Sequence, residues 1–258
     1  MGGESTTRTA PRSGGTSTGP VGSRTGQRLS GLAVALGVVL FLGGFAWGAV
    51  IYRPYTVPTS SMTPTIGVGD RVLAQRVDGS EVRRGDVVVF NDTSWVTGSA
   101  VVKRVVAVGG DTVSCCTNGK LTVNGKQIDE AYLKGNVVED KKIPTVKVPK
   151  GRLFLLGDER EGSLDSSAHL SDAAQGTVAE STVTARVDAI AWPMKGMLER
   201  PNGFKTLGPV SQPGPLRIIV TMIVAGAVLV FAGGAYGPIA KRAGARRSRA
   251  RTEPVGAR

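Results

Sequence analysis

A serine in a conformationally restricted segment is the first candidate for chemistry in this sequence. Ser61 lies in the stretch PTSSMTPTI at 58–66, where prolines on both sides restrict the backbone and small hydroxyl residues let a substrate chain come close. Acyl transfer needs such a nucleophile together with a base and a site for the oxyanion. A Ser/Thr/Pro-rich stretch is usually a linker, so composition alone leaves both interpretations open.

The sequence offers a lysine rather than a histidine as the base. Its only histidine, His169, lies in a polar stretch with loop character, where such side chains are usually solvated. A free lysine has a pKa of about 10.4, but burial in apolar surroundings disfavours its charged form. Alternation along a strand at 100–108 would place Lys103 on one face with three apolar residues: Val101, Val105 and Ala107. A lysine that snorkels from a strand edge fits the same pattern.

Adjacent cysteines, Cys115 and Cys116, are the only two in the chain. They cannot join distant parts of the fold, so the sequence contains no disulfide framework. Two interpretations stay open: a pair of small, partly buried residues, or a strained disulfide between neighbours in an oxidising compartment. With a single histidine besides, a closed Cys/His zinc site is not expected, and no metal or organic cofactor is implied.

Two long apolar segments frame the candidate residues. The first, 31–51, carries no charge, and as a helix it would extend about 31 Å, enough to cross the hydrocarbon core of a bilayer. It is longer than the apolar core of a cleaved signal peptide, and no convincing small-x-small site follows it, so we expect an uncleaved anchor. The second, 218–236, is followed abruptly by basic residues, which favours a membrane span over a buried core helix.

The net charge of +12 lies mainly in the two tails. Residues 52–215 hold 20 Lys plus Arg and 18 Asp plus Glu, so the middle of the chain is nearly neutral and nucleic acid is not an expected partner. Basic residues beside membrane spans gather on the cytoplasmic side. We therefore expect a two-pass protein of the plasma membrane with both termini cytoplasmic and the intervening domain extracytoplasmic. The C-terminal tail can also contact anionic membrane lipids, and a regulatory docking site is its other interpretation.

Short runs rich in β-branched residues fill the region between the spans, separated by turn signals such as RGD at 84–86 and NG at 124–125. The runs lie at 86–90, 100–108, 121–123, 146–148, 153–156 and 187–192. Because they do not alternate with helices, they predict a mostly β, antiparallel domain rather than a parallel doubly wound sheet.

The expected organisation has six parts in chain order. A disordered basic tail, low in apolar residues, precedes a membrane helix, a β-rich domain, a linker, a second membrane helix and a second basic tail. Their expected bounds are 1–30, 31–51, 52–207, 208–217, 218–236 and 237–258.

Four segments, in this order, resemble the type I signal peptidases. They are PTSSMTPT at 58–65, GDVVVF at 85–90, KRVV at 103–106 leading into GGD at 109–111, and GDEREGSLDS at 157–166. The resemblance covers roughly 31–200. It implies a membrane-bound serine endopeptidase that removes signal peptides from secreted preproteins, with a mostly antiparallel β fold whose apolar surface rests on the membrane. Small residues are expected at the first and third positions before the cut.

The resemblance also implies a role for each site residue. Ser61, the serine directly before methionine, would attack the scissile carbonyl after Lys103 takes its proton. The Ser61 backbone N–H and the Thr59 hydroxyl would form the oxyanion hole, and Ser163 would orient Lys103. Four further residues would support the site by ion pairs and loop packing: Arg104, Asp158, Arg160 and Asp165.

Three positions depart from the family pattern. Thr59 stands where serine is usual, although a threonine hydroxyl can still donate. Glu159 replaces an asparagine, and Ser167 stands where an arginine would be. The last change puts in doubt a supporting ion pair with Asp165, and not the serine–lysine chemistry.

Two other interpretations share some of these features. Self-cleaving repressor-type proteases use a similar β fold and a serine–lysine pair, but they are cytoplasmic and carry a DNA-binding helical domain. This chain instead shows two membrane spans. The non-enzymatic alternative is a membrane-anchored β module that binds a partner, kept open by Glu159 and Ser167.

Overall fold

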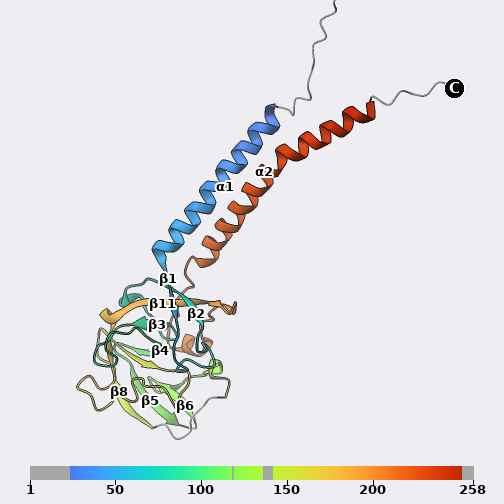
Figure 1. Ribbon diagram of the computed structural model, residues 1–258. Coiled ribbons are helices and arrows are strands. Elements are labelled where there is room, and N and C mark those ends of the chain that lie inside the picture. The colour runs from blue at the N-terminus through green and yellow to red at the C-terminus, as the bar shows by residue number, and fades with distance from the viewer. Residues whose placement is uncertain (1–23, 118, 136–141, 252–258) are drawn as a thin grey trace, which may run out of the picture. The chain divides into compact units, whose positions relative to one another are not determined.

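The structure is a computed structural model that describes residues 24–117, 119–135 and 142–251 (Figure 1). The chain divides into two compact units. The helical unit contains the described residues before Phe45 and after Val220, and the β unit is Phe45–Val220.

Two long α-helices, α1 (Arg24–Ile51) and α2 (Leu216–Arg251), contain the apolar segments. Their parts Gly26–Ile51 and Leu216–Tyr236 have mean hydropathies of 2.3 and 2.5 and are long enough to span a bilayer. Only 11% of the most apolar stretch of each is buried, whereas a core helix of a soluble protein buries its apolar face. Both helices are therefore suited to a lipid environment.

Small residues let α1 and α2 approach closely within the helical unit, where Figure 1 shows them side by side. A Cβ on Gly226 would lie 2.7 Å from the Gly37 carbonyl oxygen. Elsewhere along the pair, Ser30 Oγ donates a hydrogen bond to the Gly233 carbonyl oxygen at 2.8 Å. Close packing through small residues and interhelical hydrogen bonds is typical of helices that associate in membranes.

Both helices extend beyond the apolar segments that predicted them. α1 begins at Arg24 rather than at 31, and α2 runs from Leu216 to Arg251 rather than from 218 to 236. The prediction followed apolar residues alone, whereas Ala, Arg, Lys and Gln favour a helix without being suited to lipid. Parts of the two predicted tails are thus helical, and their remainders, 1–23 and 252–258, lie outside the described residues.

The described residues of the β unit form two antiparallel sheets, which confirms the predicted fold class. In the larger sheet the strand order is β1-β2-β11-β3-β4-β9-β10, with β12 paired to β11, and in the smaller it is β7-β6-β5-β8. The bounds in the larger sheet are β1 Tyr52–Thr56, β2 Arg71–Gln75, β3 Val87–Phe90, β4 Val101–Val108, β9 Arg152–Leu156, β10 Val178–Ala179, β11 Val183–Trp192 and β12 Gly196–Met197. Those in the smaller sheet are β5 Thr112–Thr117, β6 Lys120–Val123, β7 Lys126–Gln127 and β8 Ile143–Lys147. Short 3-10 helices occur at Gly79–Glu81, Ala131–Leu133, Glu180–Thr182 and Asn202–Leu207.

The centre of the larger sheet is buried on both faces. Val87 and Val89 of β3 pack on one side with Met62, while Val88 and Phe90 pack on the other. All four side chains of β3 are fully buried. This two-sided burial explains why the sequence of β3 is a continuous apolar run instead of an alternating one.

The six runs expected as strands overlap β3, β4, β6, β8, β9 and β11. The strands β1, β2 and β5 are not visible in that pattern. β1 contains Pro54 and follows a helix directly, and its extended conformation depends on its pairing with β2. Pairing with neighbouring strands thus stabilises β1 more than its own composition does.

Candidate active site

β4 places Lys103 in apolar surroundings. The residue is 3% exposed and lies opposite Val88 of β3. Val101 and Val105, two positions away on either side, belong to the same apolar cluster as Val88, so the predicted apolar face is confirmed at these positions. Ala107 packs in a different cluster, because the pairing of β4 with β9 shifts register between Val105 and Ala107. The predicted face is therefore correct as far as Val105 and wrong at Ala107.

A turn between β1 and β2 presents Ser61. The Ile66 N–H donates to the Met62 carbonyl oxygen at 2.8 Å, and both side chains are fully buried and anchor the turn in the core. Ser61 itself stays partly exposed. Thr59 Oγ1 lies 3.3 Å from Ser61 Oγ, within hydrogen-bonding distance. The serine is thus held on an anchored turn with a second hydroxyl beside it.

Gly157 is where the serine turn and Ser163 come together. It directly follows β9, whose last residue, Leu156, pairs with Arg104 of β4, the residue after Lys103. A Cβ on Gly157 would overlap Ser163 Oγ and would lie 2.5 Å from the Ser61 carbonyl oxygen. Only a residue without a side chain leaves room for both Ser163 and the Ser61 backbone.

The hydroxyl of Ser163 is a buried polar group that needs an explanation. Ser163 is 5% exposed, and its Oγ has no hydrogen-bond partner among the described residues. Buried hydroxyls are nearly always paired, so an unpaired one is commonly part of a functional site. Its place beside Gly157 leaves this hydroxyl available to a group that reaches the same point during a reaction.

Two of the predicted supporting residues hold the backbone of Gly157. Asp165 Oδ2 accepts the Gly157 N–H at 2.9 Å, and Arg160 Nε donates to the Gly157 carbonyl oxygen at 3.0 Å. Arg160 in turn binds both carboxylate oxygens of Glu130, at 2.9 and 2.6 Å. Burial alone would lower the pKa of Arg160, but Glu130 raises it overall, so the guanidinium stays charged.

The other supporting pair, Arg104 and Asp158, follows Lys103 and Gly157 by one residue each. The guanidinium donates two hydrogen bonds to the carboxylate, at 2.8 and 2.6 Å, and both side chains are almost completely buried. Burial alone would lower the pKa of Arg104, but Asp158 raises it overall. Thr65 Oγ1 donates to the same carboxylate at 2.5 Å. This network connects the serine turn to the residue after Gly157.

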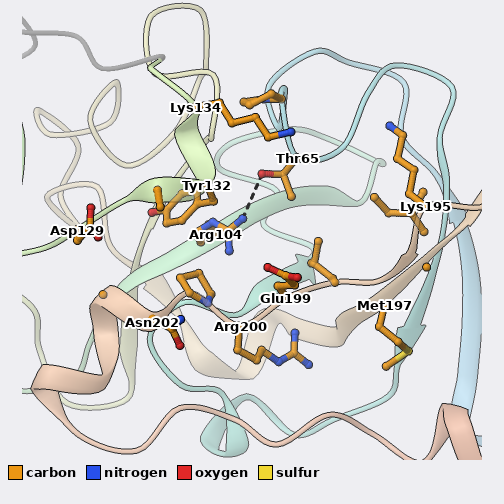
Figure 2. A pocket seen from close by; sticks show the side chains of 17 residues that line it. Thr65, Arg104, Asp129, Tyr132, Lys134, Lys195, Met197, Glu199, Arg200 and Asn202 are labelled. Carbon is orange, nitrogen blue, oxygen red and sulfur yellow. Dashed lines mark hydrogen bonds between the residues drawn. The ribbon is translucent and has the colours of Figure 1, made fainter.

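A pocket of about 590 Å³ lies beside this ion pair. Figure 2 shows Thr65, Arg104 and Tyr132 close together in it, and the Tyr132 ring centre is 4.0 Å from the Arg104 guanidinium carbon. Neither Ser61 nor Lys103 lines the pocket. The pocket therefore lies beside the Arg104–Asp158 pair and does not contain the candidate nucleophile or base.

Comparison with known proteins identifies the family of this chain. The sequence profile of a family described as signal peptidase, peptidase S26, matches residues 29–192, which is more than half of the chain. The chain belongs to the S26 signal peptidase family. Membership makes it a serine endopeptidase, and the matched residues include Ser61, Lys103 and Gly157.

Curated signal peptidases share about one third of their aligned residues with this chain. The signal peptidase I of Bacillus amyloliquefaciens is 34% identical over 177 residues, which are 64% of this chain and 84% of the relative. The signal peptidase IB of Staphylococcus aureus is 34% identical over 182 residues, or 63% of this chain and 86% of the relative. A crystal structure of a signal peptidase I from Enterococcus faecalis has 26% identity and a TM-score of 0.32, covering 45% of this chain and 96% of its own.

Two departures from the signal peptidase pattern have clear contacts in the structure. Ser167 donates its N–H and its hydroxyl to Asp165 Oδ1, at 3.0 and 2.6 Å, so a serine holds the carboxylate where an arginine was expected. Glu159 accepts the Gly162 N–H through Oε2 at 2.6 Å. Its own N–H donates to the Ser61 carbonyl oxygen at 3.1 Å, which adds a contact to the serine turn.

His169 and the cysteine pair have partners elsewhere in this signal peptidase. His169 is partly exposed and stacks on Trp95 with ring centres 4.5 Å apart, while its Nδ1 lies 2.8 Å from Asp172 Oδ2. Cys115 and Cys116 in β5 form a disulfide, the second of the two interpretations that the sequence leaves open.

Sequence reasoning assigned no role to Gly157, Thr65 or Glu130. Gly157 carried a usable signal, since a glycine at the end of a strand often marks a close backbone approach. Thr65 and Glu130 carried none, because their partners Asp158 and Arg160 lie 93 and 30 residues away in the sequence.

Proposed function

We propose that this chain is a membrane-bound type I signal peptidase that removes signal peptides from secreted preproteins, with Ser61 as nucleophile and Lys103 as base. The close approach of Ser163 and the Ser61 carbonyl oxygen to Gly157, directly after the residue that pairs with Arg104 of the lysine strand, supports the proposal. The curated relatives are signal peptidases I, which supports the substrate class.

The reaction begins when a neutral Lys103 amine takes the proton of Ser61 Oγ. Burial among valines disfavours the charged form of a lysine, and a base must be uncharged to take the proton. Ser61 Oγ then attacks the carbonyl carbon before the cut, and the carbonyl oxygen becomes an oxyanion. The Ser61 N–H and the Thr59 hydroxyl stabilise that charge.

Collapse of the tetrahedral intermediate breaks the C–N bond. The Lys103 ammonium gives its proton to the leaving amine, which becomes the N-terminus of the mature protein, and the signal peptide remains as an ester on Ser61. Water, deprotonated by the same lysine, hydrolyses the ester and restores the serine. In both steps the Ser163 hydroxyl, which is buried and has no partner among the described residues, accepts a hydrogen bond from the amine and directs it at Ser61.

The two apolar helices bring the enzyme to its substrates. With basic residues at both ends of the chain, both termini are cytoplasmic and the β unit is outside the cytoplasm. Signal peptides are held in the same bilayer by their own apolar segments, and this confinement raises the effective concentration. Apolar side chains near the β11–β12 turn support contact with lipid, since Trp192 is 64% and Met194 88% exposed.

Cleavage of a preprotein with an A-x-A site by the full-length chain in detergent tests the proposal. Ser61→Ala and Lys103→Ala should abolish cleavage, whereas Ser60→Ala, at the exposed neighbouring serine, should cleave like the unchanged protein. An acylating inhibitor should label the unchanged protein and not Ser61→Ala. Cleavage that survives Ser61→Ala would contradict the assignment of the nucleophile, and an inactive unchanged protein would contradict the function.

A further inference from the structure

The connections to both apolar helices meet at one buried carboxylate in the β unit. Tyr52 directly follows α1, and its hydroxyl donates a hydrogen bond to Asp188 Oδ2 at 2.9 Å. Leu216, the first residue of α2, donates its N–H to the same hydroxyl at 3.1 Å. The Gly214 N–H, in the linker before α2, donates to Asp188 Oδ2 at 3.1 Å. We call these four residues the clasp.

The clasp leaves no room for a side chain at Gly214. A Cβ there would overlap three atoms: Asp188 Oδ2, Gln75 Oε1 and Tyr52 Oη. Asp188 is fully buried and Tyr52 is 6% exposed, so water does not separate the partners. A backbone approach that requires glycine shows that the linker is docked on the β unit at this point.

Cations and hydrogen-bond donors around Asp188 compensate for the loss of water around its buried carboxylate. Arg200 Nη2 donates to Oδ1 at 2.5 Å, and Arg186 Nε lies 3.6 Å from the same oxygen. The Tyr52 hydroxyl donates to the other carboxylate oxygen of Asp188, Oδ2. Burial raises the pKa of Tyr52 and the charge of Asp188 raises it further, so this hydroxyl remains a donor. A buried carboxylate requires such a complete set of partners.

The linker is attached at two further positions before Gly214. Ser211 Oγ donates to Asp86 Oδ2 at 2.6 Å, and Arg186 Nη2 donates to the Gln212 carbonyl oxygen at 3.2 Å. Ser211 is itself 7% exposed. The stretch that leads into α2, expected to be a simple linker, is therefore part of the packed β unit.

We propose that Asp188 is a positioning residue for membrane-held substrates, which acts by tying the start of α2 to the end of α1. This inference rests on the proposed function. The clasp ties both connections to one point of the β unit. The cleavage site of a membrane-held preprotein stands at a set distance from its apolar segment, so a fixed point of attachment for both connections favours a productive approach to it. A soluble peptide approaches from any direction and gains nothing from the clasp.

Two variants of the full-length protein, reconstituted in lipid vesicles, test the clasp. Gly214→Ala introduces a methyl group that separates the linker from Asp188 and Tyr52. Tyr52→Phe removes the hydroxyl that joins Asp188 to Leu216. For each, kcat/KM is measured on a soluble A-x-A peptide and on a preprotein inserted in the same vesicles. The peptide value should stay unchanged, while the preprotein value should fall about fivefold, the equivalent of one net hydrogen bond. Gly234→Ala in α2, where a Cβ meets open space, is the matched control and should change neither value.

The ratio of the two rates separates positioning from damage to the fold. Equal losses on peptide and preprotein would show a merely structural role, and no loss on either would show that the clasp is dispensable; each result overturns the positioning role. If the unchanged protein cleaves neither substrate, the proposed function is wrong and the positioning role falls with it.

Discussion

The carbonyl oxygen of Ser61 lies so close to Gly157 that no side chain fits between them. A methyl group on Gly157 would be 2.5 Å from that oxygen and would also overlap Ser163 Oγ. The glycine of the fourth motif is therefore required by close packing at the candidate active site.

Gly157→Ala should lower kcat/KM on a soluble peptide by about 100-fold, since a displacement of roughly 1 Å between reacting groups can cost that much. Thermal unfolding should still show a folded β unit. Gly43→Ala in α1, where a Cβ meets open space, is the control. Full activity of Gly157→Ala would mean that the close approach is not needed for catalysis.

Thr59→Val should lower kcat by roughly 100- to 1,000-fold with little change in KM, because an oxyanion donor acts mainly in the transition state. The valine keeps the branched shape and loses only the hydroxyl that lies 3.3 Å from Ser61 Oγ. Thr59→Ser retains the hydroxyl and should keep most of the activity. Steady-state kinetics on a soluble peptide decide the matter, and equal kcat values for the two variants would remove Thr59 from the oxyanion site.

Asp158→Ala should destabilise the β unit by about 3–5 kcal/mol, because it leaves the buried Arg104 without its carboxylate. Replacing both residues by apolar ones, Arg104→Met with Asp158→Leu, should recover much of that loss. Denaturant unfolding in detergent measures both. Lys195→Ala, which breaks a pair with Asp70 in which the lysine side chain is 45% exposed, serves as a comparison and should cost at most about 1 kcal/mol. Similar losses for both pairs would show that burial does not decide how much a broken ion pair costs this fold.

Acid should weaken the β unit through Asp111. Its carboxylate accepts two hydrogen bonds from Arg84, at 2.7 and 2.5 Å, and one from the Val108 N–H at 2.9 Å. Burial alone would raise the pKa of Asp111, but these partners lower it overall. A carboxyl group with a lowered pKa stabilises the fold fully above its unfolded pKa, about 3.9, and this contribution is lost as the pH falls through the folded pKa.

Asp111→Asn should therefore flatten the dependence of stability on pH below about pH 4, while lowering stability at neutral pH. Urea unfolding of both proteins across that range measures the effect. Parallel curves for Asp111→Asn and the unchanged protein would show that other carboxyl groups cause the acid sensitivity.

The sequence offers a candidate site through local patterns, but it does not contain the pairing of the sheet that holds those residues. Ser61 and Lys103 stand in local patterns, a serine between prolines and a lysine among valines, and the order of the motifs connects them. The register shift after Val105 depends on how β4 pairs with β9, and local patterns do not contain that information. The membrane helices were found by length and hydropathy, but their ends were not, because a helix continues wherever its residues permit.

Asp188 shows most clearly which contacts cannot be predicted from local sequence patterns. It is one charged residue inside β11, and the tyrosine that binds it lies 136 residues earlier. No spacing rule connects residues that far apart, so only the assembled sheet reveals that the two helix connections share a partner.

β11 completes the larger sheet late. It lies between β2 and β3, although it is made after Ser61, Lys103 and Ser163. In a chain synthesised from its N-terminus, the candidate residues Ser61, Lys103 and Ser163 are therefore made before the strand that joins β2 to β3. The larger sheet, and the candidate site that it holds, can be completed only after β11 has been made.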